Sequence, residues 1–241
     1  MQLIYSTKMW LKKSESPLAK SAMAMVNKVR FFEVPHISII HKSLYWLHVT
    51  VTNALANSAR ILYWTPLFKS RLAQCGKQFY LYSGMPMVLG KLTITIGDHT
   101  RVSGISTFCG RSCSDITPEL VIGSNVDIGW QNSINVGQKI IIGDNVRLAG
   151  KVFLAGFPGH PVNAKKRAQG LPEEDEQTGN IILENDVWLA TGVTVLAGVT
   201  IGEGTIVGAG SIVTHDLPAG VIAAGSPAKV IKTNIKVEDY V

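Results

Sequence analysis

An aliphatic residue returns at every sixth position in the second half of the chain, and this period constrains the fold more than any other feature. The uninterrupted run comprises Leu183, Leu189, Val195, Ile201, Val207 and Val213. Six is neither the 3.6-residue period of an α-helix nor the two-residue alternation of a simple strand. It is typical of a chain that turns a corner after each short flat side and points one aliphatic side chain inward from every side.

Hexapeptide repeats are a signature of parallel β-helices, whose stacked coils bury a continuous core. The same frame extends upstream, with small offsets, through Ile96, Val102, Ile122, Ile128, Ile134, Ile142, Leu148 and Leu154. We therefore predict an all-β solenoid, a parallel β-helix over residues 91–232. A basic helical extension at 1–90 precedes it, and a short tail at 233–241 follows it.

The frame breaks at His160, which occupies the slot that should follow Leu154. Residues 157–180 are polar, charged and proline-bearing, and they show no repeat. Long excursions from a compact solenoid are usually functional or disordered. We therefore predict an excursion loop over 157–180, and we expect His160 at its start to take part in chemistry.

The positive charge of the chain is concentrated before the repeat. Residues 1–90 hold 11 Lys/Arg against 2 Asp/Glu, whereas residues 91–241 hold 12 against 15. The basic residues are dispersed and no recognition motif accompanies them, so we expect no nucleic-acid partner.

An apolar face within this basic region predicts an amphipathic helix. It comprises Leu44, Leu47, Val51, Leu55, Ala59 and Leu62. The helix carries too many polar residues to span a membrane. Two interpretations stay open: it packs on the open end of the β-helix or on a sister subunit, or residues 36–71 lie on an anionic inner membrane.

The cysteine and histidine patterns predict a reduced, metal-free protein. Cys75, Cys109 and Cys113 are odd in number and lack metal-ligand spacing, as do the histidines His36, His41, His48, His99, His160 and His215. No apolar run follows the first lysine, so we expect no signal peptide and a cytoplasmic location.

No nucleophile motif accompanies His160, and a lone histidine suits direct group transfer. An unperturbed imidazole titrates at about pH 6.5, so it is largely neutral and able to accept a proton at cytoplasmic pH. It would take the proton of an acceptor hydroxyl as that oxygen attacks an activated acyl group.

Four segments resemble the hexapeptide-repeat acyltransferases, in particular the galactoside and maltose O-acetyltransferase branch. They are Gly159-His160-Pro161, Glu184-Asn185-Asp186-Val187-Trp188-Leu189, the stretch from Gly198 to Thr214, and the ending from Ala223 to Lys232. The similarity covers roughly residues 92–232.

The resemblance implies a left-handed β-helix, a homotrimer with active sites between subunits, and acetyl-CoA as the acyl donor. It implies that His160 is the general base and that Lys229 and Lys232 bind the CoA phosphates. The remaining expected CoA contacts are Trp188, Thr191, Ala209, Thr214 and His215.

The acceptor site departs from that branch. The positions of its sugar-contacting asparagine and acidic partner fall near Gly129 and Gln138, so the chain does not retain the chemistry of either contact. We expect Trp130, Gln131 and Asn132 to line the acceptor site instead.

The sequence thus predicts acetyl-CoA-dependent O-acetylation of a saccharide hydroxyl, on a cell-surface polysaccharide, its precursor or a small sugar. The longer helical lead-in is similar to that of acetyltransferases that modify cell-surface saccharides or lipid-linked precursors. Two alternatives stay open: acetylation of an amino acid or antibiotic, and a non-catalytic β-helix scaffold.

Overall fold

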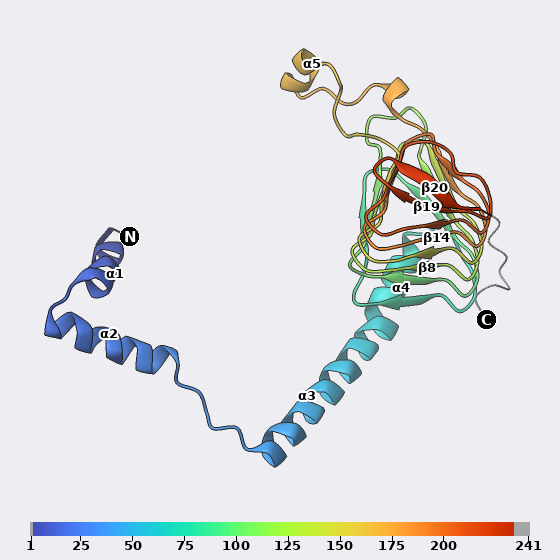
Figure 1. The fold of residues 1–241 in the computed structure, drawn as a ribbon. Coiled ribbons are helices and arrows are strands. Elements are labelled where there is room, and N and C mark those ends of the chain that lie inside the picture. The colour runs from blue at the N-terminus through green and yellow to red at the C-terminus, as the bar shows by residue number, and fades with distance from the viewer. Residues whose placement is uncertain (1, 234–241) are drawn as a thin grey trace. The chain divides into compact units, whose positions relative to one another are not determined.

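The computed structural model describes residues 2–233, which fall into two compact units, Met1–Thr52 and Asn53–Val241 (Figure 1). The first unit is helical. It contains α1 (Gln2–Lys13), α2 (Pro17–Arg30) and the first part of α3 (Ser38–Ala59). This confirms the predicted helical extension. Among residues 2–233, no helix has both the length and the apolar character that crossing a bilayer requires.

The start of α2 follows from its local sequence. The Ser16 side chain accepts a hydrogen bond from the Ala19 N–H at 3.2 Å, and Pro17 occupies the first helical turn. A serine cap followed by proline is a favoured helix start, because proline lacks a donor where the helix cannot use one.

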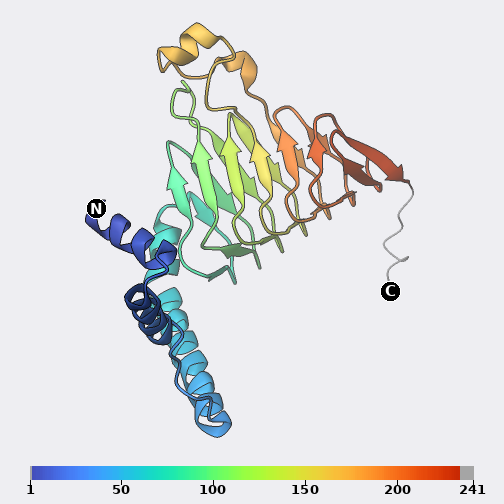
Figure 2. The same ribbon diagram turned by 60° about the vertical axis from the view of Figure 1, so that its left-hand side comes forward.

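The second unit is a triangular prism of three β-sheets whose strands stack along one axis (Figure 2). Sheet A contains, in spatial order, β1 (Gln74–Cys75), β4 (Thr93–Ile96), β7 (Glu119–Ile122), β10 (Lys139–Ile142), β13 (Ile181–Leu183) and β16 (Thr200–Ile201). Each neighbouring pair is parallel.

The other two faces repeat this arrangement. Sheet B contains β2 (Tyr80–Tyr82), β5 (Arg101–Ser103), β8 (Asp127–Ile128), β11 (Arg147–Leu148), β14 (Trp188–Leu189), β17 (Ile206–Val207), β19 (Ile222–Gly225) and β20 (Ala228–Lys232). Sheet C contains β3 (Met87–Leu89), β6 (Thr107–Gly110), β9 (Ser133–Val136), β12 (Phe153–Ala155), β15 (Thr194–Leu196) and β18 (Ile212–Val213). One strand from each sheet makes one coil, so the chain winds as a parallel β-helix.

The six-residue repeat builds the core in straight rows. In sheet A, for example, Ile96, Ile122, Ile142, Leu183 and Ile201 are direct partners on successive strands. Every predicted inward aliphatic, from Ile96 to Val213, is at most 2% exposed. The period therefore predicted the core correctly, because each repeat places one side chain on the axis.

The solenoid begins earlier than residue 91. Strands β1, β2 and β3 form a first coil, in which Leu81 is fully buried and pairs with Val102. The boundary at residue 90 was therefore wrong. The inward positions of this coil, Cys75, Leu81 and Val88, are spaced by six and seven residues, and a cysteine replaces one aliphatic. That irregularity hid the coil from the repeat.

A short helical segment caps this first coil. It consists of a π-helical turn η1 (Arg60–Trp64) and α4 (Thr65–Ser70). Phe68 is 1% exposed, and its ring centroid lies 5.9 Å from that of Phe79 and 6.3 Å from that of Phe108. The helix on the open end of the β-helix is thus α4, which lies downstream of the predicted face at Leu44–Leu62. The predicted packing of that face is not seen, because no residue of α3 is buried within the described structure.

At the other end the chain reverses direction. Strand β20 pairs antiparallel with β19, whereas every other pair in sheet B is parallel. Within residues 2–233, this hairpin ends sheet B and places Lys229 and Lys232 on the outermost strand of that sheet.

Candidate active site

The predicted excursion leaves the prism at the corner between sheets C and A. Strand β12 ends at Ala155 and β13 starts at Ile181. Between them lie α5 (Ala164–Ala168) and a short 3₁₀ turn, η2 (Asp175–Gln177) (Figure 2). The excursion is therefore an ordered lobe, which interrupts the solenoid between two regular coils.

Hydrogen bonds within the lobe hold the segment that carries His160. The Arg167 Nη1 donates to the carbonyl oxygens of Pro161 and Val162, each at 2.9 Å. The Gln177 Nε2 donates to the His160 carbonyl oxygen at 3.4 Å. Gly159 has a φ of +79°, a conformation that glycine adopts without strain. The backbone around His160 is thus fixed from both sides.

A buried ion pair fastens the lobe to the preceding part of the prism. The Arg111 Nε lies 2.5 Å from Glu173 Oε1, and the Arg111 Nη2 donates to the Glu173 carbonyl oxygen at 2.9 Å. Arg111 also pairs with Asp175. Arg111 is 3% exposed and Glu173 is 6% exposed. Sequence reasoning missed this contact, because 62 residues separate the partners and no motif links them.

A pocket of about 420 Å³ lies between the lobe and the end of β6. His160, Phe157 and Glu173 line it from the lobe, and Cys109 lines it from the prism. Burial, and secondly the negative charge of Glu173, raise the pKa of the Cys109 thiol, which therefore stays protonated at neutral pH. The thiol is thus a poor nucleophile.

The His160 side chain itself is exposed. Among residues 2–233, no group hydrogen-bonds its imidazole; only its carbonyl oxygen accepts a bond. The main chain of His160 is therefore positioned, while the ring remains open to a partner from outside the chain. No cluster of three or more potential metal ligands occurs within the same described residues.

Five of the seven predicted CoA residues lie on sheet B or at its corner with sheet C. Trp188 is in direct register with Ile206, Ile222 and Lys232 on successive strands. Three strand spacings place Trp188 and Lys232 roughly 14 Å apart along the axis. Thr191 and Ala209 follow β14 and β17 at the B–C corner, and Lys229 lies on β20.

The other two predicted CoA residues, Thr214 and His215, lie at the C–A corner, where they follow β18. The Thr214 Oγ1 lies 2.8 Å from His215 Nδ1. This is the corner from which the His160 lobe projects, two coils earlier. Sheet C separates the two corners, and its strands of two to four residues put them on the order of 10 Å apart. One chain therefore does not bring its predicted site residues together.

The three predicted acceptor residues differ in environment. Trp130 is 47% exposed, with the Lys151 Nζ 5.5 Å from its ring centroid. Gln131 is exposed, and Asn132 is only 1% exposed. The Asn132 Nδ2 donates to the Gly129 carbonyl oxygen, and its Oδ1 accepts from the Val152 N–H at 2.7 Å. The amide of Asn132 thus bonds inside the corner, and at 1% exposure it does not face an acceptor at the surface.

Comparison with known proteins places the repeat in a family. Residues 180–215 match the family model "Bacterial transferase hexapeptide (six repeats)". A Saccharomyces cerevisiae protein, YJL218W, bears the name of an acetyltransferase and is 36% identical over 150 residues, which are 58% of this chain and 74% of that protein.

Two Escherichia coli proteins are also similar. The polysialic acid O-acetyltransferase of strain O1:K1 / APEC is 41% identical over 47% of this chain and 38% of its own length. The galactoside O-acetyltransferase of strain K12 is 40% identical over 46% of this chain and 55% of its own length. The chain thus spans about half or less of these two relatives.

A solved structure has the same fold. AntD, an N-acyltransferase from Bacillus cereus, superposes with a TM-score of 0.59 over 73% of this chain and 90% of its own, at 23% identity. Its crystal form contains coenzyme A and dTDP-4-amino-4,6-dideoxyglucose. At this level of identity, the likeness concerns the fold alone.

Proposed function

The chain belongs to the bacterial hexapeptide transferase family, with a left-handed parallel β-helix, and we propose that it transfers the acetyl group of acetyl-CoA to a saccharide hydroxyl. The two E. coli relatives support this acceptor class, because both are named as O-acetyltransferases of saccharides. The chain spans 38% and 55% of these relatives, so the proposed acceptor class is supported by a partial match and by the features of the site.

The observation that carries the proposal is the position of His160, on a braced backbone at the mouth of a pocket. Its imidazole takes the proton of the acceptor hydroxyl while the hydroxyl oxygen attacks the thioester carbonyl. The carbon–sulfur bond breaks, the acetyl ester forms, and His160 passes the proton to the departing CoA sulfur. His160 thus ends the reaction in its starting state.

The residues on sheet B suit an extended CoA molecule. Lys229 and Lys232 are exposed, and no acid within residues 2–233 pairs with either, so both are available for phosphates. The exposed Thr191 and Ala209 are small enough for a pantetheine arm to approach the backbone at the B–C corner. Trp188, 48% exposed, offers an apolar wall near the thioester.

A homotrimer completes the site in this proposal. His160 and His215 belong to the C–A corner, whereas Thr191 and Ala209 belong to the B–C corner of the same chain. A cyclic trimer brings two different patches of neighbouring subunits together, because its interfaces are heterologous. The C–A corner of one subunit then faces the B–C corner of the next, with Trp130 and Gln131 near the acceptor.

The location of the enzyme stays a prediction. We place the reaction in the cytoplasm, and a contact of residues 36–71 with the inner membrane is proposed alongside it. The predicted apolar face on α3 supports such a contact, because Leu44, Leu47 and Leu55 are each more than half exposed.

The test is a transfer assay against simple sugars, lipid-linked glycans and amino acids, with acetyl-CoA binding measured by calorimetry. His160→Ala should lower turnover by roughly 10²- to 10⁴-fold, the usual contribution of a general base, and leave CoA affinity unchanged. His48→Ala removes an exposed histidine from α3 and serves as the matched control.

The outcomes separate the rival functions. Near-normal turnover in His160→Ala would refute the assigned base. Transfer to amines but not to hydroxyls would favour an amino acid or antibiotic acceptor. If the native chain fails to bind acetyl-CoA at all, the non-catalytic scaffold replaces the enzyme.

A further inference from the structure

The first unit has almost no interior of its own. Among its described side chains, residues 5–52, only Ala19 is buried. This stretch is about a fifth of the chain, yet it holds 17 of the 35 exposed large hydrophobic residues among the described residues. Isolated helices of 12 and 14 residues are marginal in water, because most helix stability comes from packing an apolar face. The exposed apolar residues of the unit therefore need a second apolar surface that would cover them.

Helix α2 shows where that surface must lie. Met23 and Val26 face α1, on which α2 packs. A second strip of the same helix is bare: Leu18, Met25 and Val29 are each at least 71% exposed. Phe31 and Phe32 follow at 74% and 77% exposed. One side of the helix pair thus presents a row of large apolar groups with no described partner.

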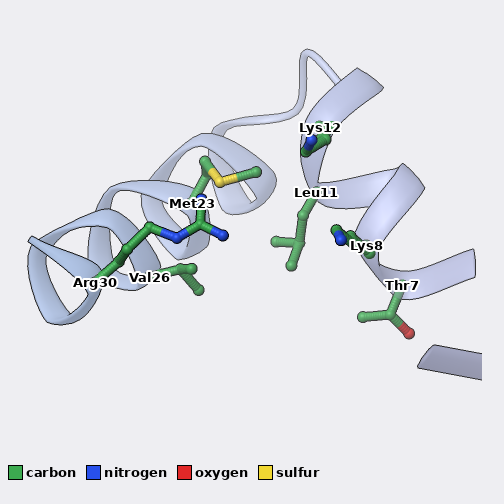
Figure 3. A pocket seen from close by; sticks show the side chains of 7 residues that line it. All are labelled: Thr7, Lys8, Leu11, Lys12, Met23, Val26 and Arg30. Carbon is green, nitrogen blue, oxygen red and sulfur yellow. The ribbon is translucent and has the colours of Figure 1, made fainter. Parts of the chain in front are cut away.

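The charges of the unit are almost all positive. Residues 1–52 contain seven Lys/Arg and two Asp/Glu, a net charge of +5. Lys8, Lys12 and Arg30 surround a pocket of about 370 Å³ between α1 and α2, over the apolar side chains of Leu11, Met23 and Val26 (Figure 3). No acid among residues 2–233 forms a salt bridge with these three cations. A pocket with cations at its rim and apolar side chains inside can bind an amphiphilic anion, because the cations pair with the charged group and the apolar side chains contact the hydrocarbon.

We propose that the α1–α2 helix pair docks on the surface of an anionic phospholipid bilayer. The strip of Leu18, Met25 and Val29 enters the boundary of the acyl chains, together with the two phenylalanines. Lys8, Lys12 and Arg30 bind lipid phosphates, and the pocket receives one headgroup. Amphipathic helices with cations beside an apolar face bind membranes in this way without spanning them.

A bilayer fits better than a protein partner for a reason of geometry. The bare apolar groups lie on three successive segments, namely α2, the Phe31–Ile37 connection and α3, where Ile39 is 80% exposed. They are thus spread over two helices and their connection rather than along one helix face. A fluid apolar phase covers all three segments at once, and its anionic surface matches the charge of +5.

Co-sedimentation of the full chain with vesicles tests the proposal independently of the reaction. The chain should bind vesicles that contain phosphatidylglycerol far more than vesicles of phosphatidylcholine alone, and raised salt should weaken the binding. Each cation near an anionic surface contributes about 1 kcal/mol, so Lys8→Gln/Lys12→Gln should weaken partitioning roughly 30-fold. Lys77→Gln/Lys91→Gln removes the same charge from exposed sites on the β-helix unit and should bind normally.

A second pair of variants tests the apolar strip. Met25→Gln/Val29→Gln keeps good helix formers on α2 and removes two apolar groups, so vesicle binding should fall. Met85→Gln/Met87→Gln, on exposed methionines of the first coil, is the control and should change nothing. Equal binding to both vesicle types, or binding that neither α1–α2 variant weakens, would overturn the proposal. So would absence of vesicle binding with self-association that the strip variant abolishes, because a second copy would then be the occupant.

Discussion

Two residues at one corner of the prism, Trp130 and Asn132, point in opposite directions. Trp130 projects outward, and its indole lies so close to Gly150 that a Cβ there would be 2.8 Å from the ring. Asn132, two residues later, turns inward and joins two coils by bonding Gly129 and Val152. The sequence assigned both to the acceptor site because they are neighbours along the chain. The direction of a side chain at a corner depends on backbone geometry, which residue type alone does not reveal.

Asn132→Ala should lower the free energy of unfolding by about 1–3 kcal/mol, because the buried Val152 N–H loses its acceptor. Urea denaturation measures this change, and the KM for the acceptor should stay unchanged. Gln138→Ala, at an exposed corner, should leave stability nearly unaltered. Unchanged stability together with a raised acceptor KM would return Asn132 to the acceptor site.

The lobe carries His160, and the buried pair of Arg111 and Glu173 joins the lobe to the prism. Removing one partner of a buried pair leaves an uncompensated charge, which costs about 3–5 kcal/mol. Arg111→Met should therefore release the lobe from the prism while the stacked coils stay folded. Trypsin should then cut faster at Lys165–Arg167, and kcat should fall while acetyl-CoA affinity is retained.

Two further variants make this prediction specific. Arg111→Met/Glu173→Leu removes both charges and should recover much of the protease resistance, because no buried charge is left alone. Lys139→Met breaks an exposed pair with Glu119 at 2.9 Å, and such pairs contribute little. If trypsin cuts the Arg111→Met and native proteins at equal rates, the pair does not hold the lobe.

The sequence revealed the periodic elements and missed those that depend on distant contacts. Ile122 and Leu189 belong to a repeat, so their burial could be predicted from spacing alone. The lobe was visible as the place where spacing fails at His160. The pairing of Arg111 with Glu173 and the packing of Phe68 on Phe108 were not visible, because each joins segments that share no pattern. The local sequence predicts the lobe, whereas the partners of the lobe and the position of the α4 cap depend on three-dimensional packing.

For the whole molecule, the division of the site between two corners has a functional consequence. His160 lies on one corner, and the proposed phosphate contacts Lys229 and Lys232 lie on another face of the same chain. If neighbouring subunits share each site, a chain that lacks His160 and a chain that lacks the two lysines can still form one intact site together. The first chain supplies the lysines and the second supplies His160.

Mixed trimers provide the test. His160→Ala chains and Lys229→Glu/Lys232→Glu chains should each be nearly inactive alone. Unfolded together and refolded at equal amounts, they should regain about a quarter of native activity, since one site in four joins two intact corners. Mass measurement should give three chains per particle. Absence of recovery in confirmed mixed trimers would mean that each chain forms its own site.

The last strand has a second consequence, which concerns aggregation. A parallel stack of coils ends in unpaired backbone N–H and C=O groups, which can template pairing with another molecule, as in amyloid. Here β20 runs against the direction of the stack and carries Lys229 and Lys232 on its exposed surface. Charged residues and reversed strands both discourage edge-to-edge pairing. On sheet B, the two lysines proposed to bind the donor therefore also discourage end-to-end pairing with another molecule.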